Sequence, residues 1–454
     1  MKSILLTTVA VAIIGGGILY GERLAKDKPR DDGRVVITYW EKWSAFEKEA
    51  MEAVVNEFND SQEKIFVKFV SVAGISNKIT LATAGGVPPD VAGLFGGNLA
   101  QYAYHESVMP LDELAAESGI SPDDYIPVYY DMCTYRGKLW ALPSTPASTA
   151  LHFNKAILRE VGWDPENPPK TIEELDKLDK LAAIKNGDKM ERMGFLPTEP
   201  GWWPFAWGPL FGGQLWNGYD KLTLTDPDVI RGYEWFGSYA EKYGSGTVQS
   251  FKEGLGTFNS PQNAFMDGRV ATVMQGVWMA NFIEMNNKDL EWAAAPFPTP
   301  ADRPDLVNPT IIDLDILVIP RGAKHPKEAF EFIKFVQSQK GMELLCMGQK
   351  KNSPLKKVSK EFIENHPNPY VQLFTDLAYS PNVIVPPKTP IWPQLSQEIR
   401  TATEKINGGT DPKEALQDVQ NKMQPLLDDI VKYEKARGVL TEEEIAKAKA
   451  GGKP

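Results

Sequence analysis

The chain has 454 residues, 42% of them hydrophobic and 24% charged, and a formal net charge of -11. This length predicts at least two lobes, and the composition is that of a folded protein. Acidic and basic residues are interspersed, so we expect no nucleic acid partner, since phosphate binding needs concentrated Lys and Arg. Cys133 and Cys346 form no CxxC or zinc pattern and lie in apolar runs. Two buried free thiols are therefore expected, with a disulfide as the alternative.

The N-terminal segment differs from the rest of the chain. Lys2 precedes an uncharged apolar run over residues 4–20, and a charged stretch follows up to residue 33. This pattern predicts export, with residues 1–33 forming a signal sequence or an N-terminal membrane anchor plus charged linker. The run is long for a signal core but adequate for a tilted span of about 17–25 residues. Both cleavage and retention stay open, and we expect a periplasmic or cell-surface protein.

The first predicted unit is a strand, a helix and a second strand. Residues 35–39 and 65–70 are rich in β-branched residues, and Ser44 with Glu47 predicts a capping box at the start of the helix between them. Parallel pairing of these strands places the loop that holds Trp43 at a carboxyl edge of the sheet. Trp43 is therefore predicted to face a cleft; a lid over the helix is the alternative.

Two further stretches in this half bear on a binding site. A predicted buried strand ends at Phe95, and the loop after it contains two glycines and Asn98. Glycine lets the backbone approach a ligand closely, and Asn98 supplies both a donor and an acceptor. Residues 144–149 are small and polar without a helical period, which predicts a crossing between lobes. Thr171 and Glu174 predict a second capping box.

The most aromatic segment spans residues 199–216. Trp202 and Trp203 precede a predicted helix whose apolar stripe fits a core, and both tryptophans lie outside that stripe. The apolar face of a pyranose can stack on a flat indole, whose N–H is free to bond a hydroxyl. We expect one of the pair to face a ligand, and the sequence leaves open which one.

The second half carries three more candidates. Ser260-Pro261 predicts a helix that ends near residue 266, followed by a strand over residues 270–274 and then Trp278, where open α/β sheets place ligand contacts. Residues 311–320 predict a central strand with Asp313 and Asp315, and a carboxylate there must reach a cleft or a partner because unpaired burial is costly. Trp392, before the final helices, is predicted either to line the cleft or to pack. Residues 434–454 are expected to form a loosely held tail.

Several of these segments, in the same order, resemble extracytoplasmic solute-binding proteins of family 1, the maltose-binding-like branch that feeds sugar ABC transporters. Residues 265–278 are similar to the family's F-x-x-G-(K/R)-x-A-x-x-x-x-G-x-W segment. Residues 137–143, 151–155 and 410–416 are similar to its GK-x-x-x-x-P, YNK and E-A-L segments, and the resemblance covers about residues 35–431.

The resemblance implies an α/β, two-lobed periplasmic-binding-protein-like fold of type II with three interlobe crossings. It implies an N-terminal lobe of residues 34–147 and 308–355 and a C-terminal lobe of residues 148–307 and 356–454. It also implies a monomer that binds a mono- or oligosaccharide in the interlobe cleft and delivers it to the permease subunits of an ABC transporter, with no cofactor and no catalysis. The predicted ligand-binding residues are Trp43, Asn98, Trp202, Trp203, Trp278, Asp313 and Trp392.

Three other functions stay open at this stage. The first is an exported carbohydrate-active hydrolase, which needs two carboxylates across a cleft, and 60 acidic residues are enough to supply them. The sequence contains no GxSxG or HExxH motif of other hydrolases. A membrane-tethered carbohydrate sensor would use residues 4–20 as its anchor. A binder of peptides or polyamines is the third alternative, although a polyamine site would need more acids beside its aromatic residues.

Overall fold

The structure is a computed structural model that describes residues 32–187, 189–440 and 445–446. The predicted signal or anchor segment, residues 4–20, lies outside the described residues, as does most of the predicted C-terminal tail. Within the described ranges, no helix is both long enough and apolar enough to cross a bilayer.

The predicted strand–helix–strand unit at the start of the chain is confirmed. β1 (Val35–Glu41) and β2 (Ile65–Ser71) pair in parallel, and α2 (Ala45–Ser61) connects them. β1 also pairs in parallel with β3 (Val91–Phe95). The strand β1 extends two residues beyond the prediction, so Trp43 lies immediately after a strand end, as expected.

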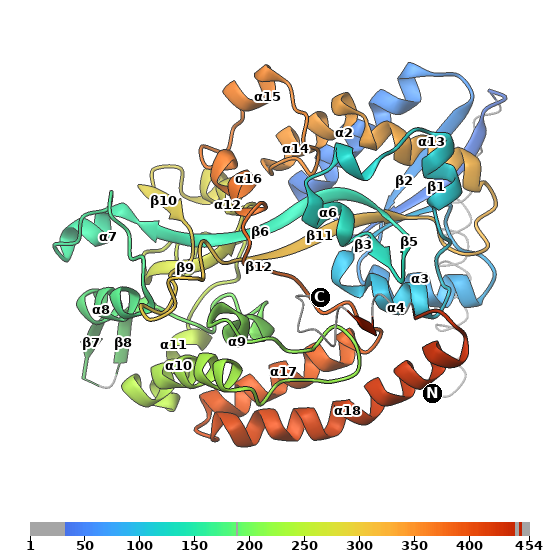
Figure 1. Cartoon of the computed structure of the whole chain (residues 1–454). Helices are drawn as coiled ribbons and strands as arrows, with labels where there is room; N and C mark the ends of the chain where they lie inside the picture. The colour runs from blue at the N-terminus through green and yellow to red at the C-terminus, as the bar shows by residue number, and fades with distance from the viewer. Residues whose placement is uncertain (1–31, 188, 441–444, 447–454) are drawn as a thin grey trace, which may run out of the picture.

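One large sheet connects both ends of the molecule (Figure 1). Its strand order is β2-β1-β3-β11-β6-β9-β8-β7, and the long strands β6 (Leu142–Asn154) and β11 (Thr310–Val318) run antiparallel through its middle. The other strands at this level are β9 (Val270–Gly276), β8 (Lys189–Phe195), β7 (Ile184–Asn186), β10 (Trp292–Ala295) and β12 (Val383–Ile384). Residues 144–149, which were predicted to cross between the lobes, lie within β6.

The two largest hydrophobic cores of the described residues, beside three small clusters, divide the structure into two lobes. Leu142 of β6 and Ile312 of β11 pack in the N-terminal core, whereas Leu151 and Ile311 of the same strands pack in the C-terminal core. The two central strands therefore belong to both cores. We call the elements packed on each core the N-terminal and C-terminal lobes; the predicted lobe boundaries themselves stay a prediction.

Helices cover both lobes. Those packed on the N-terminal core include α2, α4 (Leu99–Tyr104), α13 (Pro326–Gln337) and α14 (Gln339–Gln349). Those packed on the C-terminal core include α9 (Trp207–Leu210), α10 (Pro227–Tyr243), α11 (Ser245–Glu253), α12 (Met279–Asn286), α17 (Trp392–Asn407) and α18 (Pro412–Ala436). The remaining longer elements are α3 (Ile75–Ala84) and α8 (Ile172–Ala182).

Short elements complete the fold. They are η1 (Gly96–Asn98), α5 (Asp112–Glu117), η2 (Pro122–Asp124), α6 (Pro127–Asp131), β4 (Thr134–Tyr135), β5 (Lys138–Leu139), α7 (Lys155–Glu160), η3 (Pro204–Ala206), α15 (Lys360–Glu364) and α16 (Val371–Leu377).

One of the two predicted capping boxes is confirmed and the other is wrong. The backbone N–H of Glu174 donates to Oγ1 of Thr171 at 3.1 Å, and the Glu174 carboxylate accepts from the Thr171 N–H in return. The Ser44 side chain makes no capping hydrogen bond. The Glu47 carboxylate instead pairs with Nζ of Lys351 at 3.1 Å. The carboxylate that the capping box needed is thus engaged by a lysine that is distant in sequence.

Two further local predictions are wrong. Residues 260–266 form turns and not a helix, because the Asn263 side chain accepts hydrogen bonds from the backbone N–H groups of Phe265 and Met266. The predicted tail does not begin at Glu434, because α18 continues to Ala436 and Glu434 is 2% exposed. Cys133 and Cys346 are both buried free thiols, as predicted.

Candidate ligand-binding site

Trp278 lies between β9 and α12 and packs over the end of the strand. A Cβ atom added at Gly276 would lie 2.2 Å from its ring, so glycine at this position is what lets the indole lie against the backbone. The ring centroids of Trp202 and Trp203 lie 5.9 and 6.1 Å from that of Trp278. The structure thus brings three predicted residues into one indole cluster, in which Trp202 and Trp278 stay partly exposed.

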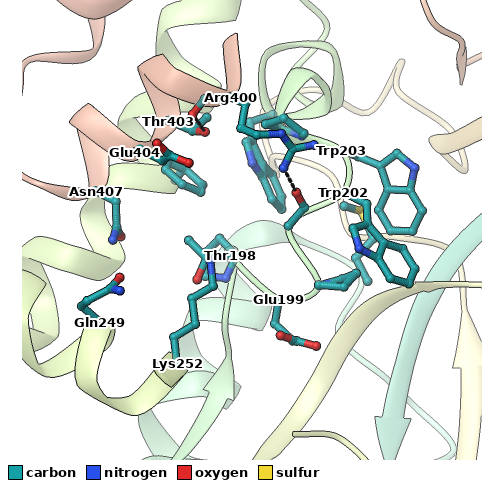
Figure 2. A pocket seen from close by; sticks show the side chains of 17 residues that line it. Thr198, Glu199, Trp202, Trp203, Gln249, Lys252, Arg400, Thr403, Glu404 and Asn407 are labelled. Atoms are coloured by element: carbon teal, nitrogen blue, oxygen red, sulfur yellow. Dashed lines mark hydrogen bonds between the residues drawn. The ribbon is translucent and has the colours of Figure 1, made fainter. Parts of the chain in front are cut away.

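A polar pocket adjoins this cluster and was missed by the sequence reasoning (Figure 2). The loop that holds Trp202 and Trp203 forms one wall, residues of α11 and α17 form others, and Trp207, Phe236 and Met274 complete the lining. Nη1 of Arg400 donates to the Gly201 carbonyl oxygen at 2.7 Å and supports the loop. The polar side chains that line the pocket are Thr198, Glu199, Gln249, Lys252, Arg400, Thr403, Glu404 and Asn407.

Glu199 is the most electrostatically perturbed residue of this pocket. Burial raises the pKa of its carboxyl to about 7, although Lys252 lowers the pKa in part. The peptide bond between Glu199 and Pro200 is cis. A carboxyl that titrates near neutrality can either accept or donate a hydrogen bond, which suits a ligand that carries hydroxyl groups.

Trp43 lies across from the indole cluster, on the N-terminal core. It is 4% exposed, and Nζ atoms of Lys42 and Lys351 lie 4.9 and 5.6 Å from its ring centroid. Nζ of Lys351 also lies 5.8 Å from the ring centroid of Trp278. One lysine therefore connects the predicted indoles of the two lobes by cation–π contacts. With its ring covered in this way, Trp43 offers less open surface than Trp202 or Trp278.

Buried acids compensate these two lysines. Asp315 pairs with Nζ of Lys42 at 2.9 Å and with Nζ of Lys351 at 3.4 Å, and Lys351 also pairs with Glu47. Burial alone would raise the pKa of Asp315, but the two ammonium groups hold it below its usual value. Of the two acids predicted on β11, Asp315 is thus the one with charged partners.

Asp313 lies two residues earlier on the same strand, and no lysine of the described residues pairs with it in a salt bridge. Its Oδ1 accepts from the backbone N–H groups of Gly97 and Leu314 at 3.2 and 2.8 Å. Burial raises the pKa of its carboxyl to about 6. Because the side chain remains partly exposed, Asp313 can still bind a ligand hydroxyl.

Trp392 and Asn98 lie on either side of the Gly97 loop that hydrogen-bonds Asp313. A Cβ atom at Gly97 would lie 3.4 Å from Nε1 of Trp392, whose ring packs edge-on against Phe205 at 5.0 Å. Trp392 is 5% exposed, so packing accounts for most of its surface. Asn98 is partly exposed at the start of α4, beside the Tyr102 hydroxyl. The seven predicted residues therefore form an indole cluster, a lysine-linked Trp43 and a second group around Gly97.

Phe95 is a further candidate that the sequence reasoning missed. It is the last residue of β3 and is 45% exposed, and Nζ of Lys42 lies 4.8 Å from its ring centroid. A phenylalanine at the end of an apolar run is normally interpreted as core. The only signal available was its position at the carboxyl end of a strand, where sheets of this type place ligand contacts.

The model of the bacterial extracellular solute-binding protein family matches residues 53–369. The chain belongs to this family. This places the solute-binding protein outside the cytoplasm, while its attachment to a membrane through residues 4–20 stays a prediction.

Several relatives of this solute-binding protein are named for their ligands. The maltotriose-binding protein of Pyrococcus abyssi is 22% identical over 269 residues, which is 59% of this chain and 54% of the relative, so the chain spans about half of that protein. A maltooligosaccharide ABC transporter solute-binding lipoprotein of Streptococcus pneumoniae is 22% identical over 334 residues, or 70% and 73% of the two chains. The sn-glycerol-3-phosphate-binding periplasmic protein UgpB of Agrobacterium fabrum is 26% identical over 235 residues, or 47% and 53%.

Solved structures confirm the predicted two-lobed type II fold. CpMnBP1 with mannotriose bound is similar with a TM-score of 0.76 and 24% identity, over 86% of this chain and 99% of that one. The sugar-binding protein MalE from Xanthomonas citri is similar with a TM-score of 0.71 and 19% identity, over 90% and 100% of the two chains. At these sequence identities the structural similarity establishes the fold and not the ligand.

Proposed function

We propose that this solute-binding protein holds a saccharide between its lobes and delivers it to the permease subunits of an ABC transporter. The observation that carries the proposal is the indole cluster at the carboxyl end of β9, in which Trp202 and Trp278 are partly exposed beside a pocket of amide, hydroxyl and charged groups. Indole faces suit the C–H patches of a pyranose, and planar polar side chains suit its hydroxyls. The relatives named for maltotriose and maltooligosaccharides support the same ligand class.

The mechanism follows from where the candidate residues lie. Trp278 packs against the C-terminal core and Trp43 within the N-terminal core, so one ligand can contact both only when the lobes are close together. Binding then favours the closed arrangement by its differential affinity, which is a population shift. We infer that the closed form is the one the permease recognises, and that the protein itself performs no hydrolysis.

Where Trp43 and Trp278 approach each other, charge pairing of the two nearby lysines favours a neutral sugar over a phosphorylated ligand. A phosphate site needs cations that are free to bind it, whereas Lys42 and Lys351 are each paired with buried carboxylates. The similarity to UgpB nevertheless makes sn-glycerol 3-phosphate the appropriate contrast ligand.

Titration calorimetry tests the proposal. The protein is titrated with mannotriose, maltotriose, glucose and sn-glycerol 3-phosphate, and each saccharide is recovered after prolonged incubation. We expect saturable heat with at least one saccharide, no heat with the phosphate ester and no cleavage product. Heat with glycerol phosphate alone would reject the saccharide class, and a cleavage product would favour the hydrolase alternative. A normal affinity without the N-terminal segment would not distinguish a transporter component from a tethered sensor, so permease-dependent uptake in membrane vesicles completes the test.

A further inference from the structure

The last helix of the chain connects the two lobes away from the central strands. Most of α18 packs in the C-terminal core through residues that include Ala415, Val419 and Val431. Figure 1 shows the helix running below α17 and ending beside α4 of the N-terminal lobe. The helix therefore still packs in the C-terminal core at Val431 and reaches the N-terminal lobe at its end.

Glu434, in the last turn, is buried against the N-terminal lobe. Its carboxylate accepts hydrogen bonds from Nε and Nη2 of Arg136 at 3.2 and 2.7 Å, and from the Tyr135 hydroxyl. The side chains of Arg136 and Glu434 are 9% and 3% exposed, and Tyr135 packs in the N-terminal core. A buried carboxylate is costly unless it is paired, so this contact depends on both partners.

The turn that presents Arg136 has a backbone suited to the task. Arg136 and Gly137 adopt positive φ values of 50° and 69° between the short strands β4 and β5. Two successive residues in this region form a tight hairpin turn, and a non-glycine residue pays a steric cost there. The hairpin holds Arg136 directed toward α18.

Two more contacts surround the buried pair. The rings of Tyr433 and Tyr104 lie 5.4 Å apart in an edge-on arrangement, and Nη2 of Arg437 binds the Glu106 carboxylate at 3.0 Å. Tyr104 packs against the N-terminal core, and Glu106 follows α4. Aromatic packing, a buried ion pair and an exposed ion pair thus join the same two surfaces.

We propose that the end of α18 is an interlobe clasp, formed by Tyr433, Glu434 and Arg437 on one lobe and by Tyr104, Glu106, Tyr135 and Arg136 on the other. The clasp stabilises the arrangement in which the two parts of the candidate site lie together. In that same arrangement Lys351 contacts both Trp43 and Trp278, and Gly97 lies against Trp392. Other contacts join the lobes near the central strands, such as Nδ2 of Asn281 with the Gln349 carbonyl oxygen, but the clasp acts at a separate place.

The consequence for binding follows from the proposed function. A protein whose binding-competent arrangement is only partly populated has an apparent Kd that rises as that population falls. Loss of the clasp should therefore weaken saccharide binding without any change in a residue that contacts the sugar. The clasp would therefore change the affinity for the saccharide without changing which saccharide is bound.

Interlobe distances measured without ligand test the clasp directly. Spin labels at Glu63→Cys and Glu241→Cys lie on exposed positions of the two lobes, and both native cysteines are buried. We expect the parent protein to populate the short interlobe distances of the clasped arrangement, and the Glu434→Gln and Arg136→Met variants to populate them less, with a shift toward longer distances. An unchanged distribution in both variants, with normal circular dichroism, would overturn the proposal.

Two controls keep the result interpretable. Glu291→Gln removes an exposed ion pair with Arg159 inside the C-terminal lobe and should leave the distances unchanged. Arg437→Ala removes only the exposed part of the clasp, and Glu106 keeps its pairing with Arg321 at 3.1 Å. If the buried variants do not fold, Arg437→Ala should still shift the distribution toward longer distances, and a parent-like result for it would count against the clasp.

Calorimetry with mannotriose and maltotriose supplies the second readout. Glu434→Gln should raise the Kd by between about threefold and tenfold if the competent population falls in that proportion. Failure of mannotriose, maltotriose and glucose alike to bind the parent protein would count against the saccharide proposal and leave the distance result standing. An unchanged Kd beside a shifted distribution would overturn the link between the clasp and binding.

Discussion

At the scale of single residues, the indole rings differ in how much surface they can offer a ligand. Trp202 and Trp278 are partly exposed, whereas Trp43, Trp203 and Trp392 are each less than a tenth exposed. A sugar gains contact only from ring surface that the protein does not already cover. The largest loss of binding is therefore expected at the two exposed rings.

Trp278→Ala should raise the Kd for the bound saccharide by roughly 10- to 100-fold, because burial of a large apolar side chain is worth about 1.5–3 kcal/mol. Calorimetry measures the change. Trp163→Ala is the matched control, since that indole bonds the Asn167 carbonyl oxygen outside the site. An unchanged affinity in a folded Trp278→Ala variant would remove the indole cluster from the binding site.

Asp313 predicts a pH dependence of stability. Burial raises its pKa to about 6, from an ordinary value of 3.8. A group whose pKa is raised on folding binds its proton more tightly in the folded state, so its favourable contribution is complete below pH 3.8 and is lost as pH rises through 6. Above pH 6 the ionised carboxylate is a cost of roughly 3 kcal/mol at most, from about 1.36 kcal/mol per pKa unit.

Asp313→Asn removes this titration. Urea unfolding between pH 4.5 and 7.5 should show the variant gaining stability relative to the parent protein as pH rises, most steeply between pH 4.5 and 6. A difference between the two proteins that does not change across this range would show that Asp313 is not perturbed as described.

At the scale of elements, two helix starts with similar sequence signatures differ in structure. Thr171 caps α8 with its side chain, whereas Ser44 makes no capping bond at α2. Thr171→Ala should cost about 1 kcal/mol in the free energy of unfolding, and Ser44→Ala should change it by less than about 0.5 kcal/mol. Urea unfolding at constant m-value measures both. Equal losses in the two variants would contradict the difference in capping.

The same comparison shows what could be predicted at this scale. The strands were recoverable because runs of β-branched residues between polar breaks carry a local signal, and β1, β2, β9 and β11 all follow it. The cap at Ser44 was not recoverable, since Glu47 bonds a lysine 304 residues away. The helix expected after Ser260 failed because the Asn263 side chain offered the backbone a turn instead.

At the scale of the whole molecule, the fold could be predicted because several moderately specific segments occur in the same order as in the family. The site was harder to predict because its charged residues pair with residues that are distant in sequence. Trp202, Trp203 and Trp278 came together as expected because each follows a recognisable element. Lys351, Arg400 and Glu199 were missed, because charged residues on helices and loops are usually solvated. Their partners lie on segments that are distant in sequence, so only the folded structure brings them to one site.

The two-lobed arrangement makes a final prediction about how a ligand acts on the whole protein. If the sugar contacts both lobes, any opening that exposes the cleft must first release the sugar. Amide hydrogen exchange at the cleft should therefore slow in both lobes together. At a ligand concentration of 100 times the Kd, release costs about 2.7 kcal/mol, which corresponds to roughly 100-fold slower exchange. Amide hydrogen exchange should therefore slow in residues 41–47 and 95–99 of the N-terminal lobe as well as in residues 199–203 and 276–282 of the C-terminal lobe. Trp278→Ala at the same sugar concentration is the control, and with its Kd raised roughly 10- to 100-fold it should show only about 2- to 10-fold slowing. Protection confined to the C-terminal segments would mean that the sugar binds one lobe alone, and closure over the ligand would then have no driving force.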